Sequence, residues 1–384
     1  MKTPTKTMKL VIDENIAYIR ETFAGYGEIV LSHGRKITNE LLKDADVLIV
    51  RSITNVNAEL LQNTNVKFVG TATIGTDHID KEYLKQNNIA FADAKGCNAD
   101  AVTEYVYTAI SKFLVESGTP SEGVKLGVIG RGNIGGRVVK LAPYLGLKLL
   151  VNDPPLQRQG VKYPFVDLQT ALSADILTIH TPLYKSGIDK TLHLINSDNI
   201  GRTQNIRFLI NASRGETAET FALTELTKER KIPLCLDVWE NEPKINSELL
   251  GLSRFASPHI AGYTLEGKIN GTMMMKKALD KFINYSDTFT LLPPLVEDSR
   301  IQLQSNKPII EILYEASRFV YKIEKDTEIL KQAAGMPAEE SGKYFDSLRR
   351  NYELRREFTN YTIELLPYNA QAARVLRMFR FNVV

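Results

Sequence analysis

The chain has 384 residues, which is long enough for two or three domains. Hydrophobic residues make up 43% and charged residues 24%, as in ordinary globular proteins, which excludes a disordered, collagen-like or coiled-coil chain. The net charge of +3 is too small to indicate nucleic acid or a membrane surface as a partner. The cysteines, Cys97 and Cys235, set no disulfide framework, and no apolar run approaches ~18 residues. We therefore expect a cytoplasmic protein with no signal peptide and no membrane span.

Short apolar runs alternate with helix-like segments in the N-terminal part of the chain. Strands are expected at residues 9–13, 47–50, 66–70 and 89–91, and helices at 15–23, 38–42 and 79–86. This alternation predicts an α/β fold, in which a doubly wound parallel sheet carries helices on both faces. We expect residues 1–97 to form a substrate-binding, catalytic domain.

A helix-like segment at 98–113 leads into a second alternating unit, and the pattern changes after Pro294. We expect residues 98–265 to form a second doubly wound domain, and a helix at 266–290 to cross back to the first. Residues 291–384 are expected to form a small α+β C-terminal domain that mediates dimerisation. The expected strands of the second unit are 124–129, 148–151, 175–179, 207–210 and 233–237. The C-terminal part is expected to contain helices at 307–324, 338–358 and 370–379 and strands at 361–365 and 380–384.

A glycine-rich loop, Gly130-Arg131-Gly132-Asn133-Ile134-Gly135, directly follows the strand at 124–129 and opens a helix. Its glycines allow a tight turn, the approach of a pyrophosphate to backbone amides, and close packing of helix on strand. Asp153 follows the next strand, 18 residues after Gly135, where a carboxylate accepts the ribose hydroxyls of NAD and repels the extra phosphate of NADP. We therefore predict NAD as the cofactor of a Rossmann domain. Two alternatives stay open: a glycine-rich turn without a nucleotide, and NADP held by Arg158.

Arg214 and Glu242 follow the expected strands at 207–210 and 233–237, and His259 lies in the next segment of the chain. We expect the three residues to converge at the edge where open α/β sheets bind their ligands. Arginine holds a carboxylate with its planar fork, and histidine can accept the proton of a hydroxyl as a hydride leaves the adjacent carbon. A glutamate bonded to the other ring nitrogen fixes the histidine tautomer. The pattern suits the oxidation of a 2-hydroxy acid, although each residue could instead have a structural role. No Cys/His cluster has zinc spacing, so we expect no metal.

These segments resemble the D-2-hydroxyacid dehydrogenase family over nearly the whole chain up to residue 300. The resemblance rests on the glycine loop with Asp153 and on residues 211–215, 239–243 and 257–262. It implies that Arg214 and Glu242 are active-site residues and that His259 transfers the proton. The implied substrate contacts are Ser52, Thr73 and Tyr263, and the implied NAD contacts beyond the glycine loop are Asp153, Thr181, Asp237 and Gly262.

Residues 50–54, 70–80 and 259–268 and the extra C-terminal domain resemble one branch of this family more closely. That likeness implies oxidation of 4-phospho-D-erythronate, a small phosphorylated hydroxy acid, to its 2-oxo product in pyridoxal phosphate biosynthesis, by a homodimer. Arg51 is a candidate for binding the substrate phosphate, from across a cleft that faces the NAD domain. The alternatives are another D-2-hydroxy acid, such as 3-phosphoglycerate, and a non-enzymatic NAD-sensing scaffold.

Overall fold

The computed structural model describes residues 8–201 and 204–384, which divide into two compact units. Unit 1 contains the described residues up to Asn98 together with Thr264–Pro294, and unit 2 contains Ala99–Tyr263 and Leu295–Val384. The C-terminal residues, expected as a third domain, therefore belong to the same compact unit as residues 99–263. Over the described part of the chain, no helix is both long enough and apolar enough to cross a membrane.

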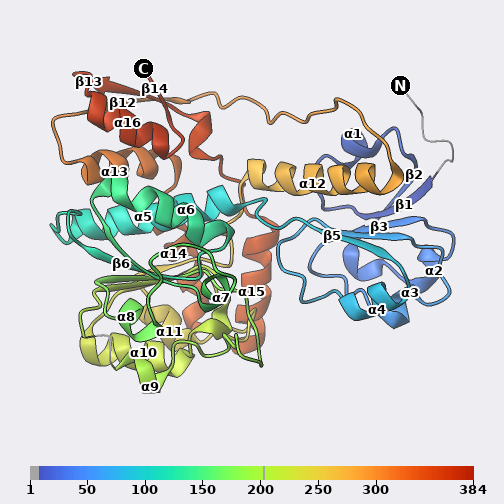
Figure 1. The fold of residues 1–384 in the computed structure, drawn as a ribbon, viewed down its shortest axis with the longest axis horizontal. Helices are drawn as coiled ribbons and strands as arrows, with labels where there is room; N and C mark the ends of the chain where they lie inside the picture. The colour runs from blue at the N-terminus through green and yellow to red at the C-terminus, as the bar shows by residue number, and fades with distance from the viewer. Residues whose placement is uncertain (1–7, 202–203) are drawn as a thin grey trace. The chain divides into compact units, whose positions relative to one another are not determined.

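Unit 1 is built on a five-stranded parallel sheet in the order β2-β1-β3-β4-β5 (Figure 1). The central strands β3 and β4 are fully buried and mostly apolar, as expected where helices cover both faces of a parallel sheet. The edge strand β2 was not expected from the sequence, although it contains the short apolar run Ile29-Val30-Leu31, and most of its residues are half-buried. The strands are β1 (Met8–Asp13), β2 (Gly27–Ser32), β3 (Val47–Val50), β4 (Phe68–Thr71) and β5 (Ala90–Asp93).

The helices of unit 1 are short except for α12, which returns to this unit late in the chain. Thr264 caps α12 by accepting a hydrogen bond from the amide of Gly267 at 3.0 Å. Lys276 on α12 is almost fully buried, and its charge is matched by Asp280 at 2.8 Å and Asp287 at 2.7 Å. The helices are α1 (Ile19–Phe23), α2 (Asn39–Leu42), α3 (Ala58–Leu61), α4 (Lys81–Gln86) and α12 (Leu265–Ile283).

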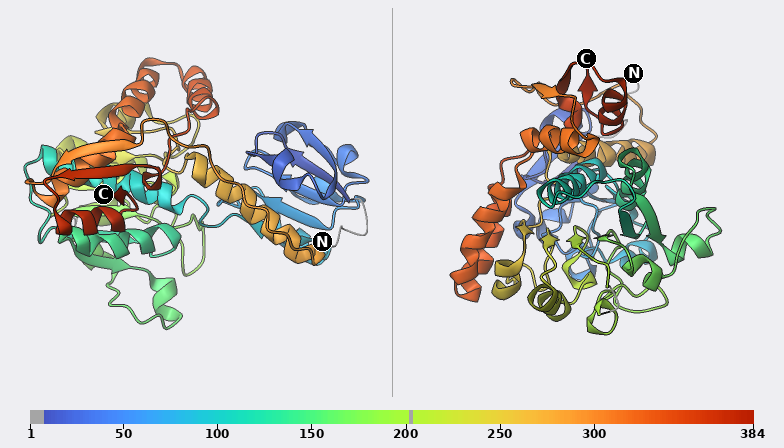
Figure 2. Two further views of the ribbon diagram at one scale, coloured as in Figure 1. Left: turned by 90° about the horizontal axis from the view of Figure 1, so that it is seen from above. Right: turned by 90° about the vertical axis from the view of Figure 1, so that its left-hand side faces the viewer.

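Unit 2 contains a six-stranded parallel sheet in the order β11-β10-β9-β8-β6-β7. Helices α5 and α6 cover one face of this sheet, and α8, α10 and α11 cover the other (Figure 2, right). The strands are β6 (Lys125–Ile129), β7 (Lys148–Asn152), β8 (Ile176–Ile179), β9 (Phe208–Asn211), β10 (Leu234–Leu236) and β11 (Phe255–Ala256). The helices are α5 (Ala99–Glu116), α6 (Asn133–Leu141), α7 (Pro154–Arg158), α8 (Leu168–Leu172), α9 (Ser197–Ile200), α10 (Thr220–Arg230) and α11 (Ser247–Leu252).

The C-terminal residues form a small parallel sheet, β12-β13-β14, with four helices. The single helix expected at 307–324 was wrong: the chain leaves helical geometry at Tyr321, which separates α13 from α14. The helix expected at 338–358 ends at Arg350, and β12 was not expected. The elements are β12 (Arg300–Gln304), α13 (Ile309–Val320), α14 (Ile323–Lys331), α15 (Ala338–Arg350), β13 (Thr362–Leu366), α16 (Ala370–Met378) and β14 (Asn382–Val383).

One hydrophobic core joins the C-terminal residues to the larger sheet of unit 2. Tyr107 of α5 packs edge-on against Phe379, with ring centroids 4.8 Å apart, and α5 also packs on α13. The predicted fold class, with doubly wound parallel sheets and a small additional α+β part, is confirmed. Because the strand order of unit 2 reverses between β6 and β8, a ligand crevice is expected at the carboxyl ends of these strands.

Candidate active site

The glycine loop turns at the carboxyl end of β6, where the strand order reverses. Gly130 has a φ of +88°, and a Cβ there would lie 2.7 Å from the carbonyl oxygen of His180. A Cβ on Gly135 would lie 1.9 Å from the carbonyl oxygen of Gly130, so side chains are excluded from both positions. At Gly132, which precedes α6, no atom lies within 4 Å of the Cβ position. The loop therefore leaves its backbone open beside a helix N-terminus, as a pyrophosphate requires.

Asp153 links the glycine loop to the end of β7. Its Oδ2 accepts a hydrogen bond from the amide of Arg131 at 2.7 Å, and its Oδ1 accepts one from Leu156 at 2.9 Å. Each carboxylate oxygen keeps further acceptor capacity for a ribose hydroxyl. Arg158, the residue that could have favoured NADP, forms an ion pair with Asp189.

Several buried polar atoms near the glycine loop have no hydrogen-bond partner among the described residues. They are Nδ1 of His180, Oγ1 of Thr181 and Nε of Arg131. Burial lowers the pKa of His180 to about 3, so its imidazole is neutral. A buried polar atom left unpaired costs about 1–3 kcal/mol, so a polar ligand that bonded to these atoms would be stabilised. These atoms, together with the open loop, fit a dinucleotide.

His259 and Glu242 form a hydrogen-bonded pair, with 2.8 Å between Nδ1 and Oε2. The other glutamate oxygen, Oε1, accepts a bond from the amide of Trp239 at 2.8 Å. Burial alone would raise the pKa of Glu242, but the charge and hydrogen bond of His259 and the Trp239 amide outweigh burial and lower it. The carboxylate therefore stays ionised, holds the proton of the imidazole on Nδ1, and leaves Nε2 available to a substrate. Glu242 is thus held between His259 and the Trp239 amide and is not a solvated turn carboxylate.

Asp237, predicted as an NAD contact, is buried and holds the loop that carries His259. Its carboxylate accepts hydrogen bonds from the hydroxyl of Ser257 at 2.7 Å and from the amides of Ile260 at 2.7 Å and Ala261 at 3.0 Å. Burial raises the pKa of Asp237. This supporting role was not predicted from the sequence, because nothing in the order of residues indicates which loop a buried carboxylate will bind.

Arg214 lies on the loop after β9, next to the segment that carries Glu242. A Cβ on the neighbouring Gly215 would lie 1.9 Å from the carbonyl carbon of Trp239, so the two loops are in close contact. The carbonyl oxygen of Arg214 accepts hydrogen bonds from Asn211 at 3.0 Å and Thr217 at 2.7 Å. The loops that carry Arg214, Glu242 and His259 thus follow three adjacent strands, β9, β10 and β11.

The predicted substrate contacts of unit 1 follow its adjacent strands β3 and β4. The hydroxyl of Thr73 lies 2.7 Å from that of Thr71 and donates to the carbonyl oxygen of Gly75 at 3.0 Å. Ser52 is exposed, and Arg51 reaches the carbonyl oxygen of Asn15 at 3.5 Å. In unit 2, the hydroxyl of Tyr263 accepts a hydrogen bond from Arg349 at 3.3 Å. Gly262 belongs to the same loop.

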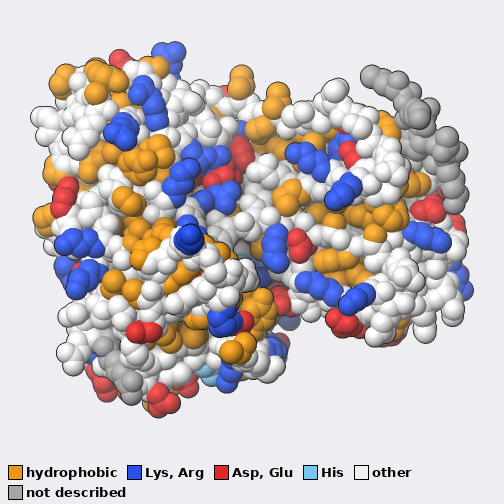
Figure 3. All heavy atoms as spheres, in the orientation of Figure 1, with side chains coloured by type: hydrophobic (Ala, Val, Ile, Leu, Met, Phe, Trp, Pro, Cys, Tyr) orange, Lys and Arg blue, Asp and Glu red, His pale blue; other side chains and the backbone are white. Residues whose placement is uncertain are grey.

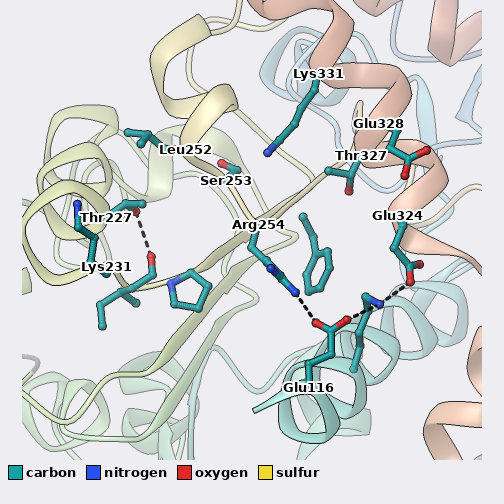
Figure 4. Close-up of a pocket in the computed structure, with 14 residues that line it drawn as sticks. Glu116, Thr227, Lys231, Leu252, Ser253, Arg254, Glu324, Thr327, Glu328 and Lys331 are labelled. Atoms are coloured by element: carbon teal, nitrogen blue, oxygen red, sulfur yellow. Dashed lines mark hydrogen bonds and ion pairs between the residues drawn. The ribbon is translucent and has the colours of Figure 1, made fainter.

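Figure 4 shows a pocket of about 590 Å³ in unit 2, and none of the candidate site residues lines it. Its lining includes Pro233 and Arg254, which precede β10 and β11, whereas the candidate active-site residues follow these strands. Its Lys112 and Arg254 are ion-paired with Glu116. We therefore do not assign the chemistry to this pocket. Among the described residues, no cluster of His, Cys, Asp and Glu could hold a metal ion.

Two arginines from the C-terminal part of unit 2 reach the candidate site and were missed in the sequence. Arg349 on α15 contacts Tyr263, and Arg355 donates to backbone carbonyls directly after His259. The Arg-rich stretch at 349–356 gave no local sign of such a role, because these contacts join residues far apart in the chain.

Comparison with known proteins agrees with this geometry. Residues 99–261 match the NAD binding domain of the D-isomer specific 2-hydroxyacid dehydrogenases, and residues 291–378 match a domain of unknown function, DUF3410. The erythronate-4-phosphate dehydrogenase of Proteus mirabilis is 42% identical over 98% of this chain and 99% of its own length. That of Klebsiella pneumoniae is 41% identical, with the same coverage.

Solved structures show the same fold over about three quarters of the chain. The NAD-bound 3-phosphoglycerate dehydrogenase of Entamoeba histolytica has a TM-score of 0.58 and 25% identity, and the match covers 76% of this chain and 100% of that one. The D-lactate dehydrogenase of Aquifex aeolicus, complexed with NAD and lactic acid, has a TM-score of 0.57 and 24% identity, with coverage of 72% and 95%.

Proposed function

Because the chain belongs to the erythronate-4-phosphate dehydrogenase family, we propose that it oxidises 4-phospho-D-erythronate with NAD to 3-hydroxy-2-oxo-4-phosphobutanoate. This reaction would serve pyridoxal phosphate biosynthesis. The observation that carries the proposal is the His259–Glu242 pair, on loops at the same edge of the sheet as the glycine loop.

In the proposed mechanism, the residues of this chain orient the hydroxy acid and take its proton. Arg214 holds the substrate carboxylate through its guanidinium fork and polarises the reacting oxygen. Nε2 of His259 accepts the hydroxyl proton, and ionised Glu242 stabilises the imidazolium that forms. The glycine loop and Asp153 would hold NAD, which would supply the hydride acceptor for the carbon that bears this hydroxyl. Ser52, Thr73 and Tyr263 stay predictions for substrate contacts, and Arg51 for the phosphate.

A panel of hydroxy acids tests the proposal. We expect the purified full-length chain to reduce NAD with 4-phospho-D-erythronate at a kcat/KM well above that with 3-phosphoglycerate or D-lactate. A higher value for 3-phosphoglycerate would replace the proposed substrate with the alternative one. Tight NAD binding without turnover of any substrate would favour the NAD-sensing scaffold.

Cofactor choice depends on Asp153 in this proposal. Replacing Asp153 with Ser removes the negative charge that disfavours a 2′-phosphate, so we expect NAD affinity to fall and NADP affinity to rise. Asp153 also caps α7 by accepting from the amide of Leu156, and because Ser is a good N-cap residue the fold should survive. Dissociation constants for both nucleotides, measured by fluorescence titration, provide the check. A wild-type chain that prefers NADP would contradict the assignment of Asp153.

We further propose that the enzyme is a cytoplasmic homodimer that associates through its C-terminal residues. Hydrophobic side chains reach the surface in this part of unit 2, among them Phe319, Leu366, Tyr368 and Val384 (Figure 3, upper left). We expect the double substitution Leu366→Glu and Tyr368→Glu to yield monomers, because carboxylates would be desolvated at such an interface. Light scattering of the variant and the wild-type chain measures this, and an unchanged mass would argue against the surface. Truncation after Pro294 is a poorer test, because those residues complete the core of unit 2.

A further inference from the structure

The loop that carries His259 is held in a conformation that a non-glycine residue rarely adopts. His259 has a φ of +57°, in the left-handed region, and its amide donates to the carbonyl oxygen of Asp237 at 2.7 Å. Such backbone strain persists only where surrounding contacts determine the conformation. The placement of the imidazole therefore depends on the groups that bind the residues directly after it.

Two charged side chains bind opposite polar groups of Ile260 and Ala261. Asp237 accepts their amide hydrogens, as described above. Arg355 donates to their carbonyl oxygens: Nη1 lies 3.0 Å from the oxygen of Ile260, and Nη2 bonds to that of Ala261. The N–H groups of this segment are thus held by Asp237, the residue directly after β10, and its carbonyl groups by a residue of the C-terminal part of the chain.

Arg355 is itself fixed by further contacts within unit 2. Its guanidinium lies over the ring of Tyr321, 4.5 Å from the centroid, and Nη2 also reaches the carbonyl oxygen of Ala101 at 3.3 Å. The Tyr321 ring is held in turn, because its hydroxyl donates to Asp326 at 2.9 Å. A planar guanidinium restrained in this way can bind two neighbouring carbonyl oxygens at once. The ammonium of a lysine would do so less well, because it is a single point charge on a flexible chain.

We propose that Arg355 is a positioning residue for His259, and that the C-terminal part of the chain thereby sets the geometry of proton transfer in addition to any role in association. The inference rests on the proposed function, because it takes His259 as the proton acceptor. Arg349 extends the same restraint, since it binds Tyr263 at the end of this loop.

The test compares Arg355→Met and Arg355→Lys with the matched control Arg356→Met, all in the full-length chain. Arg356 is the next residue and bonds Asn360 within its own segment at 2.9 Å. For Arg355→Met we expect kcat to fall about 10²-fold, the loss that a misplacement of ~1 Å produces, with KM and NAD affinity little changed. Arg355→Lys should recover part of the loss, and Arg356→Met should behave as wild type.

Hydrogen exchange separates this inference from the proposed function. In Arg355→Met, the amides of Ile260 and Ala261 should exchange faster while the strands of the large sheet stay protected, whether or not 4-phospho-D-erythronate is a substrate. Unchanged exchange in this loop, or equal losses in Arg355→Met and Arg356→Met, would overturn the positioning role. A wild-type chain without turnover would refute the proposed function alone, and the exchange result would still decide the role of Arg355.

Discussion

Replacing His259 with Asn is expected to lower kcat by about 10²–10⁴-fold, the usual contribution of a positioned general base. Asn is close in size to His, keeps a polar group toward Glu242 and tolerates the left-handed backbone at this position, so the loop should keep its shape. The proton of the substrate hydroxyl would then have no acceptor when the hydride leaves the adjacent carbon. Stopped-flow measurement of NADH formation would isolate the chemical step.

The chain offers a matched control for this substitution. His193 also pairs with a glutamate, since its Nε2 lies 2.6 Å from Oε1 of Glu240. His193→Asn therefore breaks a histidine–carboxylate pair of the same kind, and we expect it to retain near-normal turnover. Similar losses in both variants would show that the effect is structural and would reject the assigned role of His259.

The pH dependence of stability provides a second test of the pair formed by His259 and Glu242. The pKa of Glu242 is lowered in the folded state, so its carboxylate stays charged when the pH falls to the ordinary pKa of a glutamate. The carboxylate should therefore keep its hydrogen bond to His259 until the pH falls below the lowered pKa. Stability that comes from the pair should likewise be present at neutral pH and be lost only at lower pH. A Glu242→Gln variant lacks this charge. Its free energy of unfolding should therefore be lower than that of wild type at neutral pH, and the two values should converge in acid.

Local patterns were sufficient to predict the parts of the fold that local physics determines. A buried parallel strand such as β3 is a continuous apolar run, which predicts a strand directly. The glycine loop needs its glycines wherever it occurs. The loops after β9 and β10 could be grouped because carboxyl ends of parallel strands share an edge. The strand β11, which precedes the His259 loop, was not expected from the sequence. Their spatial order, and the hydrogen bond between His259 and Glu242, required coordinates.

What escaped prediction depends on contacts between distant parts of the chain. Asp237 was predicted only as a nucleotide contact, although its carboxylate organises the His259 loop. Arg355 stands about a hundred residues after that loop, in an Arg-rich stretch that looks like an ordinary solvated surface. The break between α13 and α14 was missed because both flanking segments have apolar residues at helical spacing, so periodicity gave no sign of an end at Tyr321.

Replacing Arg214 with Lys is expected to lower kcat/KM by about 10²–10³-fold, the cost of removing one donor that stabilises developing charge. Lysine keeps the positive charge but not the fork that binds a carboxylate at two points, so the substitution tests geometry and not charge alone. Arg207→Lys is the control. It lies just before the same strand, β9, and bonds Thr119 at 2.7 Å, so it changes an arginine at the far end from the candidate site.

The result expected for Arg214→Lys is a loss in both kcat and substrate affinity, with NAD affinity and thermal stability unchanged. The backbone of this loop should hold, because Asn211 and Thr217 bind the Arg214 carbonyl and not its side chain. Steady-state kinetics with 4-phospho-D-erythronate and nucleotide titration supply these quantities. Full activity in Arg214→Lys would mean that another cation binds the substrate carboxylate. A loss confined to NAD affinity would place the guanidinium at the cofactor and remove it from the reacting centre.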